Sequence, residues 1–95
     1  MAQGLPLGYA YSYLNQTTTP VTVKAGAGIL HAITVNNIGT NMTITIADAT
    51  SVTSPAIAIT GTITTLGTLF YDVSFNTGLT ITLGGTPGNI TVCYQ

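Results

Sequence analysis

Charged residues are almost missing from this 95-residue chain: Asp, Glu, Lys and Arg together make up 3% of it, against about 25% in an ordinary soluble domain. The complete charged set is Lys24, Asp48 and Asp72. Charge normally keeps a protein surface from adhering to its neighbours. A surface of Thr, Asn and Ser can form hydrogen bonds and costs little to desolvate, so this composition indicates a building block whose faces are covered by other protein.

Further absences exclude several classes of function. There is no Arg and the net charge is −1, so no basic patch can neutralise phosphates and we expect no nucleic-acid partner. No apolar run approaches the roughly 20 residues that span a bilayer, and no signal-peptide pattern is present, so we expect no membrane contact and synthesis in a cytoplasm. The single cysteine, Cys93, excludes an intrachain disulfide and is expected to be a small buried hydrophobic residue.

Residue combinations that support catalysis or metal binding are missing too. His31 is the only imidazole, and because it lies in an alternating apolar segment we expect a buried or interface histidine rather than a general base. Asp48 lies in a loop of small polar residues, where an Asx turn accounts for it. Asp72 lies in the middle of an expected strand. Since these residues and Cys93 show no ligand spacing, we predict no catalytic residues, no metal ion and no cofactor.

What the chain does contain is two-residue alternation of β-branched and aromatic residues, without a helical period. This pattern predicts strands at residues 17–24, 29–35, 42–47, 57–59, 68–75, 79–83 and 90–94, and a short one at Ile63. Segments rich in Asn and Gly at 36–41, 76–78 and 84–88 are expected to be turns. Roughly seven or eight antiparallel strands at such spacing are typical of a β-sandwich or jelly roll, so we predict a single all-β domain over residues 17–95.

The alternation also assigns side chains to faces of the strands. It predicts that Ile29, His31, Ile33 and Val35 share one face. We expect the hydrophobic core to include Ile33, Ile44, Val73, Ile81 and Val92.

Residues 1–16 have a different pattern, in which a segment with Gly and Pro precedes the alternating Tyr9, Tyr11 and Tyr13. We interpret these residues as an extended N-terminal arm. Tyr side chains offer large, rigid contact area and a hydroxyl group, so the three tyrosines are candidate partner-binding residues. The alternative is an edge strand whose tyrosine face packs on its own sheet, and alternation alone does not distinguish the two.

Several stretches resemble a known group of proteins. They are residues 30–36 (LHAITVN), 43–48 (TITIAD), 67–75 (GTLFYDVSF), 78–80 (GLT) and 90–94 (ITVCY). Spread over residues 28–95, they are similar to small structural proteins encoded among the virion genes of tailed bacteriophages. The resemblance implies a small β-sandwich on the virion, a capsid decoration or cement protein that binds the major capsid protein as a homotrimer and stabilises the outer shell. Tyr9, Tyr11 and Tyr13, outside the match, would then contact the capsid or a neighbouring subunit.

Two other classes of function stay open. The first is a receptor- or glycan-binding module on a tail or head fibre, although its loops would be expected to carry aromatic residues and these loops are rich in Thr, Ser, Gly and Asn. The second is a Thr-rich ice-binding or fibre-forming protein, suggested by Thr-Ile-Thr at 43–45, 62–64 and 80–82. These triplets lack the fixed period that a solenoid requires.

Overall fold

The computed structural model describes residues 9–95, and every regular element in that range is a β-strand. The strands are β1 (Ala10–Asn15), β2 (Val21–Ala25), β3 (Gly28–Ala47), β4 (Ala56–Ile59), β5 (Gly67–Phe75) and β6 (Gly78–Tyr94). All pairings are antiparallel and join the six strands into one sheet, so the expected all-β class is confirmed. Residues 9–95 form no helix of the length and apolar character needed to cross a membrane.

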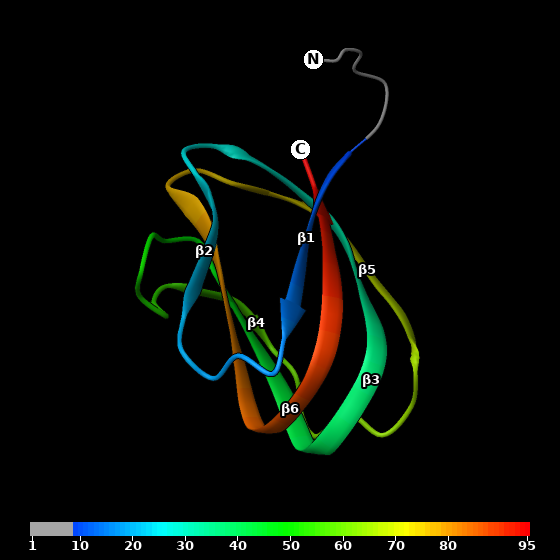
Figure 1. Ribbon diagram of the computed structural model, residues 1–95. Coiled ribbons are helices and arrows are strands. Elements are labelled where there is room, and N and C mark those ends of the chain that lie inside the picture. Colours follow the sequence, from blue (N-terminus) through cyan, green and yellow to red (C-terminus); the bar gives the residue numbers. More distant parts are fainter. Residues whose placement is uncertain (1–8) are drawn as a thin grey trace.

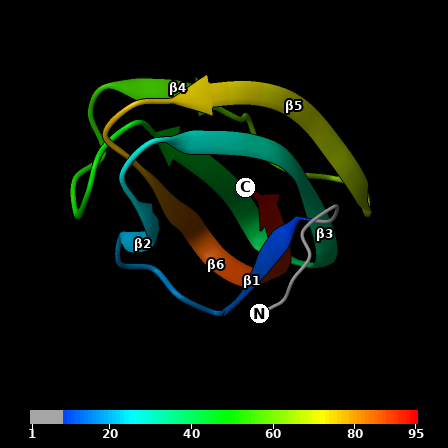
Figure 2. The same ribbon diagram turned by 90° about the horizontal axis from the view of Figure 1, so that it is seen from above.

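Two long strands, β3 and β6, organise the sheet. They pair with each other from Leu30↔Tyr94 at one end to Ala47↔Thr80 at the other, and both curve strongly between these ends (Figure 1). On one side of the bend, β6 also pairs with β1 and β3 with β5; on the other side, β6 pairs with β2 and β3 with β4. We call these two parts half-sheet A (β1–β6–β3–β5) and half-sheet B (β2–β6–β3–β4). Seen from above, the strands surround a common interior (Figure 2).

The bend arises where the sequence predicted turns. Gly39, Asn41 and Gly85 have positive φ angles of 70°, 52° and 72°, and the β3–β6 register shifts in this region. Such shifts are β-bulges, which bend a strand without ending it. Each pair of predicted strands around these segments is therefore one continuous strand, and residues 9–95 contain six strands rather than seven or eight. Ile63 forms no strand, although its N–H donates a hydrogen bond to the Met42 carbonyl.

The two half-sheets enclose one hydrophobic core. Four of the five predicted core residues are fully buried, and Val73 is half-buried against the cluster. Each fully buried aliphatic or aromatic side chain contributes about 1.5–3 kcal/mol relative to an exposed one, so this cluster holds the halves together. Its members are Leu14, Leu30, Ile33, Val35, Met42, Ile44, Ile46, Phe75, Leu79, Ile81, Leu83, Ile90 and Val92.

A second bulge in β3 changes which residues share a face. The register between β3 and β6 shifts by one residue at His31, so the alternation changes phase: Leu30 faces the core before the bulge, and Ile33 and Val35 face it after the bulge. Ile29 is exposed and His31 half-buried, whereas Ile33 and Val35 are buried in the core. The prediction that these four residues share one face is wrong, because an inserted residue leaves no trace in the alternation.

The part of the predicted arm that the structure describes contains an edge strand. All six residues of β1 pair with β6, from Ala10↔Tyr94 to Asn15↔Asn89, and Leu14 is buried in the core. The edge strand was the alternative that the tyrosine alternation left open, but the tyrosines themselves are exposed rather than packed on the sheet. Residues 1–8 of the predicted arm lie outside the described residues.

Candidate functional site

The largest exposed aromatic side chains gather on the outer face of half-sheet A. Tyr9, Tyr11 and Tyr13 are 46%, 73% and 56% exposed, and Phe70 on β5 is 70% exposed. Successive side chains of a strand alternate between its faces, so the three tyrosines lie on the same side of β1. We call Tyr9, Tyr11, Tyr13, His31, Phe70 and Asp72 the tyrosine face.

His31 connects the strands of this face. Its imidazole stacks on the Tyr9 ring, with ring centroids 4.3 Å apart and an angle of 7° between the planes. The Phe70 ring meets the same imidazole edge-on, at 5.8 Å and 69°, and His31 Nδ1 is hydrogen-bonded to Asp72 Oδ1. Tyr9, which directly precedes β1, is thereby joined in one cluster with His31 of β3 and with two residues of β5. The bulge at His31 makes this possible, because it turns the imidazole outward.

Hydroxyl and amide groups lie at other positions of the outer face. Thr34 and Thr68 share a hydrogen bond of 3.1 Å between their Oγ1 atoms, and Asn36 Nδ2 donates one of 3.0 Å to Thr91 Oγ1. Thr91 lies directly opposite Tyr13 in the pairing of β1 with β6. The one charged residue of the tyrosine face, Asp72, is engaged by His31. The face therefore combines aromatic contact area with uncharged hydrogen-bonding groups.

Cys93 lies opposite Tyr11 in the same pairing. It is half-buried rather than fully buried, in contrast to the sequence prediction. Its position on β6 is fixed by pairing with β1 on one side and β3 on the other. Cys93 thus lies beside the tyrosine face.

The hydrogen-bonded pair of His31 and Asp72 is the polar part of this cluster. In a His–Asp arrangement that activates a nucleophile, the second ring nitrogen is hydrogen-bonded to a Ser, Thr or Cys. Across residues 9–95, the side-chain hydrogen bond formed by His31 is the one to Asp72. The same range holds no group of three or more His, Cys, Asp or Glu side chains that could bind a metal ion.

Asp48 has a structural role that differs from the expected Asx turn. Its carboxylate accepts hydrogen bonds from the N–H groups of Asn76 at 3.0 Å, Thr77 at 2.8 Å and Gly78 at 3.3 Å. These bonds, those from Asn76 and Thr77 above all, hold the pKa of Asp48 below its ordinary value of 3.8. Asp48 thus fixes the turn between β5 and β6.

Burial raises the pKa of Tyr71, whose ring packs against the core.

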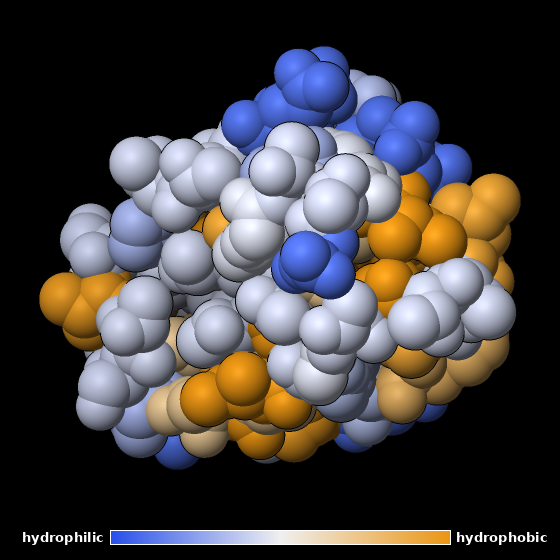
Figure 3. All heavy atoms as spheres, turned by 90° about the horizontal axis from the view of Figure 1, so that it is seen from below, coloured by the Kyte–Doolittle hydropathy of each residue, from blue (hydrophilic) through white to orange (hydrophobic). Residues whose placement is uncertain are grey.

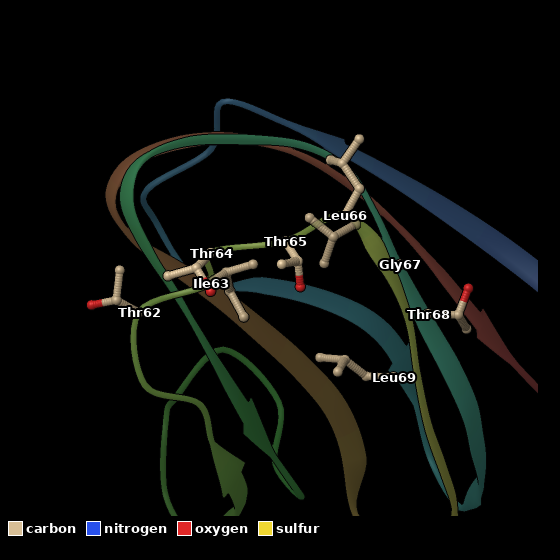
Figure 4. Close-up of a pocket in the computed structure, with 9 residues that line it drawn as sticks. Thr62, Ile63, Thr64, Thr65, Leu66, Gly67, Thr68 and Leu69 are labelled. Atoms are coloured by element: carbon tan, nitrogen blue, oxygen red, sulfur yellow. The ribbon is translucent and has the colours of Figure 1, made fainter.

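A cleft of about 310 Å³ opens where the chain crosses from β4 to β5. Residues 62–69 and Val35 line it, and Figure 4 shows Leu69 pointing from β5 into the space beneath the crossing segment. The lining combines threonine hydroxyls with aliphatic groups and has no titratable side chain. The cleft suits an uncharged group and offers no acid or base. Nothing in the sequence marks it, because the crossing itself depends on the tertiary fold.

The sequence identified three residues of the tyrosine face and missed the others. Phe70 could have been found, because it alternates with Leu69 and Tyr71, which face the core. His31 could not, since its outward position depends on the bulge. Asp72 was placed correctly in a strand, but its hydrogen bond with His31 was not predicted.

Most of the visible surface is neither charged nor strongly polar. In the view from below, weakly polar residues cover much of the molecule, with hydrophobic patches between them and a few strongly hydrophilic residues (Figure 3). Exposed large hydrophobic residues outside the tyrosine face are Ile29, Val52, Ile59 and Leu66.

The chain matches no protein-family model, and neither curated proteins nor solved structures show a significant match to it.

Proposed function

We propose that this protein is a virion structural protein, a capsid decoration or cement protein that binds the outer shell of a tailed bacteriophage as a homo-oligomer and stabilises it. The tyrosine face is the observation that carries the proposal. Exposed Tyr and Phe side chains on a strand framework are suited to act as anchors in a protein interface. The resemblance of residues 28–95 to phage virion proteins supplies the kind of partner, the major capsid protein.

The bent sheet supports the fold class expected for such a protein. Its halves share β3 and β6 and pack their inner faces around one core, which is how two sheets pack in a β-sandwich. We therefore propose a small sandwich of jelly-roll type, in which the bends of the two long strands replace separate connections. The outer face of half-sheet A is then free for the shell.

An oligomer makes such a surface effective without strong individual contacts. Repeated copies related by symmetry place several tyrosine faces on a shell at once, and linked weak contacts give tight overall attachment. Surface ion pairs are worth about 0–1 kcal/mol each, and this chain has one basic residue, Lys24. Attachment should therefore depend on apolar contacts and hydrogen bonds, and it should resist salt.

The test is co-sedimentation of purified protein with shells that lack it, at low and at high salt. We expect the wild type to bind at both, and the Tyr9→Ser/Phe70→Ser double variant to lose occupancy, because both rings that contact His31 are removed. Val52→Ser is the matched control, since it removes an exposed hydrophobic side chain outside the tyrosine face. Release of the wild type by high salt, or equal binding of the double variant, would refute the proposed mode of attachment.

A receptor- or glycan-binding module on a fibre is the second candidate. The observation in its favour is that exposed Tyr11 and Tyr13 lie on one side of β1, with the Thr91 hydroxyl opposite Tyr13. Flat rings with hydroxyl groups beside them suit a sugar as well as a protein. Binding of soluble host polysaccharide that is lost in a Tyr11→Ser/Tyr13→Ser double variant, without binding to shells, would favour this candidate over the first.

A further inference from the structure

Among residues 9–95, four strands lie at the edges of the half-sheets: β1 and β5 in half-sheet A, and β2 and β4 in half-sheet B. An edge strand presents unpaired N–H and C=O groups that can pair with another chain. Proteins commonly prevent this by short strands, bulges, charged residues or proline at the edge. A comparison of the four edges therefore shows which of them is available for pairing.

Three of the four edges carry such protection. β2 contains Lys24 and a register shift next to it. β4 has four residues, follows Pro55 and pairs with β3 through another shift. β5 contains Asp72, which has a positive φ of 48° and lies opposite the shifted position of β3. Each of these edges is interrupted or too short for extended pairing.

β1 carries none of these features. Its six residues pair with β6 in unbroken register, and its sequence, AYSYLN, has no charge, proline or glycine. The order of residue types is symmetric about Ser12: Tyr11 and Tyr13 flank it, and the apolar Ala10 and Leu14 lie outside them. In a two-fold antiparallel contact between identical strands, residues at equal distances on either side of the axis meet each other, so this order places tyrosine opposite tyrosine and apolar residues opposite apolar residues.

We propose that the free edge of β1 pairs antiparallel with β1 of a second copy, on a two-fold axis at Ser12. Tyr11 then lies opposite the partner's Tyr13, and Tyr13 opposite the partner's Tyr11, so that aromatic rings form cross-strand pairs. Ala10 lies opposite the partner's Leu14. No like charges meet, because the strand is uncharged. The two half-sheets A become one continuous eight-stranded sheet, with both tyrosine faces on the same side.

This contact is independent of the proposed function, because it requires no shell. It closes at two copies, and so differs from the homotrimer implied by the resemblance, which needs a different interface. If the protein binds a shell, the two-chain sheet offers twice the contact surface of a single chain. Two tyrosine faces on one rigid sheet can bind a shell simultaneously.

The test uses the full chain and measures its mass by analytical ultracentrifugation over a wide concentration series. The wild type should shift with concentration from the monomer mass of 9.7 kDa to twice that mass. Tyr11→Lys/Tyr13→Lys and Tyr11→Glu/Tyr13→Glu should each stay monomeric, since like charges would lie opposite each other. An equimolar mixture of the two should regain the two-chain mass. Phe70→Lys, which adds a charge to the same face on β5, is the control and should behave as the wild type.

Circular dichroism and a cooperative melt would show that each variant is folded, which we expect because both tyrosines are more than half exposed. A wild type that stays monomeric throughout the series would overturn the proposal without any variant. A mixture of Lys and Glu variants that stays monomeric would overturn the antiparallel register, as would a wild-type oligomer that both double variants retain. A wild type that forms a three-chain oligomer, retained in both double variants, and that binds shells would refute this inference and leave the proposed function standing.

Discussion

Replacing Ile33 and Ile29 by Ala, one at a time, tests the bulge that places the tyrosine face. Both are isoleucines of β3, four residues apart, but Ile33 is 0% and Ile29 39% exposed. Ile33→Ala removes buried methyl groups and leaves a cavity in the core, which costs about 2–5 kcal/mol. Ile29 lies outside the buried core cluster, so Ile29→Ala opens no enclosed cavity, and its cost should stay nearer the roughly 1 kcal/mol range of β-propensities. Had the two shared a face, as simple alternation predicted, the costs would be similar.

The cost of Ile33→Ala is large relative to the total free energy of unfolding. A chain of this length has a free energy of unfolding of about 5–14 kcal/mol, at 0.05–0.15 kcal/mol per residue, so Ile33→Ala removes a considerable part of it. At about 4–8 °C per kcal/mol, its melting temperature should fall by about 8–40 °C. Urea titrations followed by circular dichroism and tyrosine fluorescence are suitable, since the chain has no Trp. Equal destabilisation by both substitutions would refute the assignment of opposite faces.

Two further substitutions test the turn and the bend. Asp48 has a folded-state pKa below its unfolded value of 3.8. Its carboxylate therefore contributes stability above pH 3.8, and this stability is lost as the pH falls through the folded-state pKa. Asp48→Asn should flatten the acid dependence of the urea midpoint, and an unchanged dependence would contradict this argument. A Cβ on Gly88 would lie 2.0 Å from the Asn37 carbonyl oxygen, so Gly88→Ala should cost about 1–3 kcal/mol through overpacking. Gly61→Ala, which meets nothing within 4 Å, is the control; equal melting of the two variants would argue against a tight bend.

Strand positions could be predicted from the sequence because inward and outward residues alternate in most of them. In β5, for example, half-buried Leu69, Tyr71 and Val73 alternate with exposed Phe70, Asp72 and Ser74. The class of fold follows from such segments. They say nothing about which strands become neighbours, since pairing depends on contacts between residues far apart in the chain.

The bends could not be distinguished from turns for a local reason. Asn and Gly at 36–41 and 84–88 indicate positive φ, and both a hairpin turn and a bulge within a strand use that conformation. The choice is made by long-range pairing, here of Thr43 with Gly84 on one side of the bend and Val35 with Ile90 on the other. The His31 bulge contains no Gly or Asn at all, which is why the cluster of His31 with Tyr9, Phe70 and Asp72 could not be predicted.

The position of β6 affects how the chain can fold during synthesis. β6 pairs with β1, β2 and β3, yet it follows all of them in the chain. Until the ribosome has synthesised β6, β1 and β2 have no strand to pair with. During this time the apolar residues of the nascent chain stay exposed, and the chain has little charge to keep it soluble. Pairings as distant as Ala10↔Tyr94 also close slowly, as is general for folds dominated by non-local contacts. Truncations that stop before Gly78 should therefore aggregate rather than form a smaller folded domain.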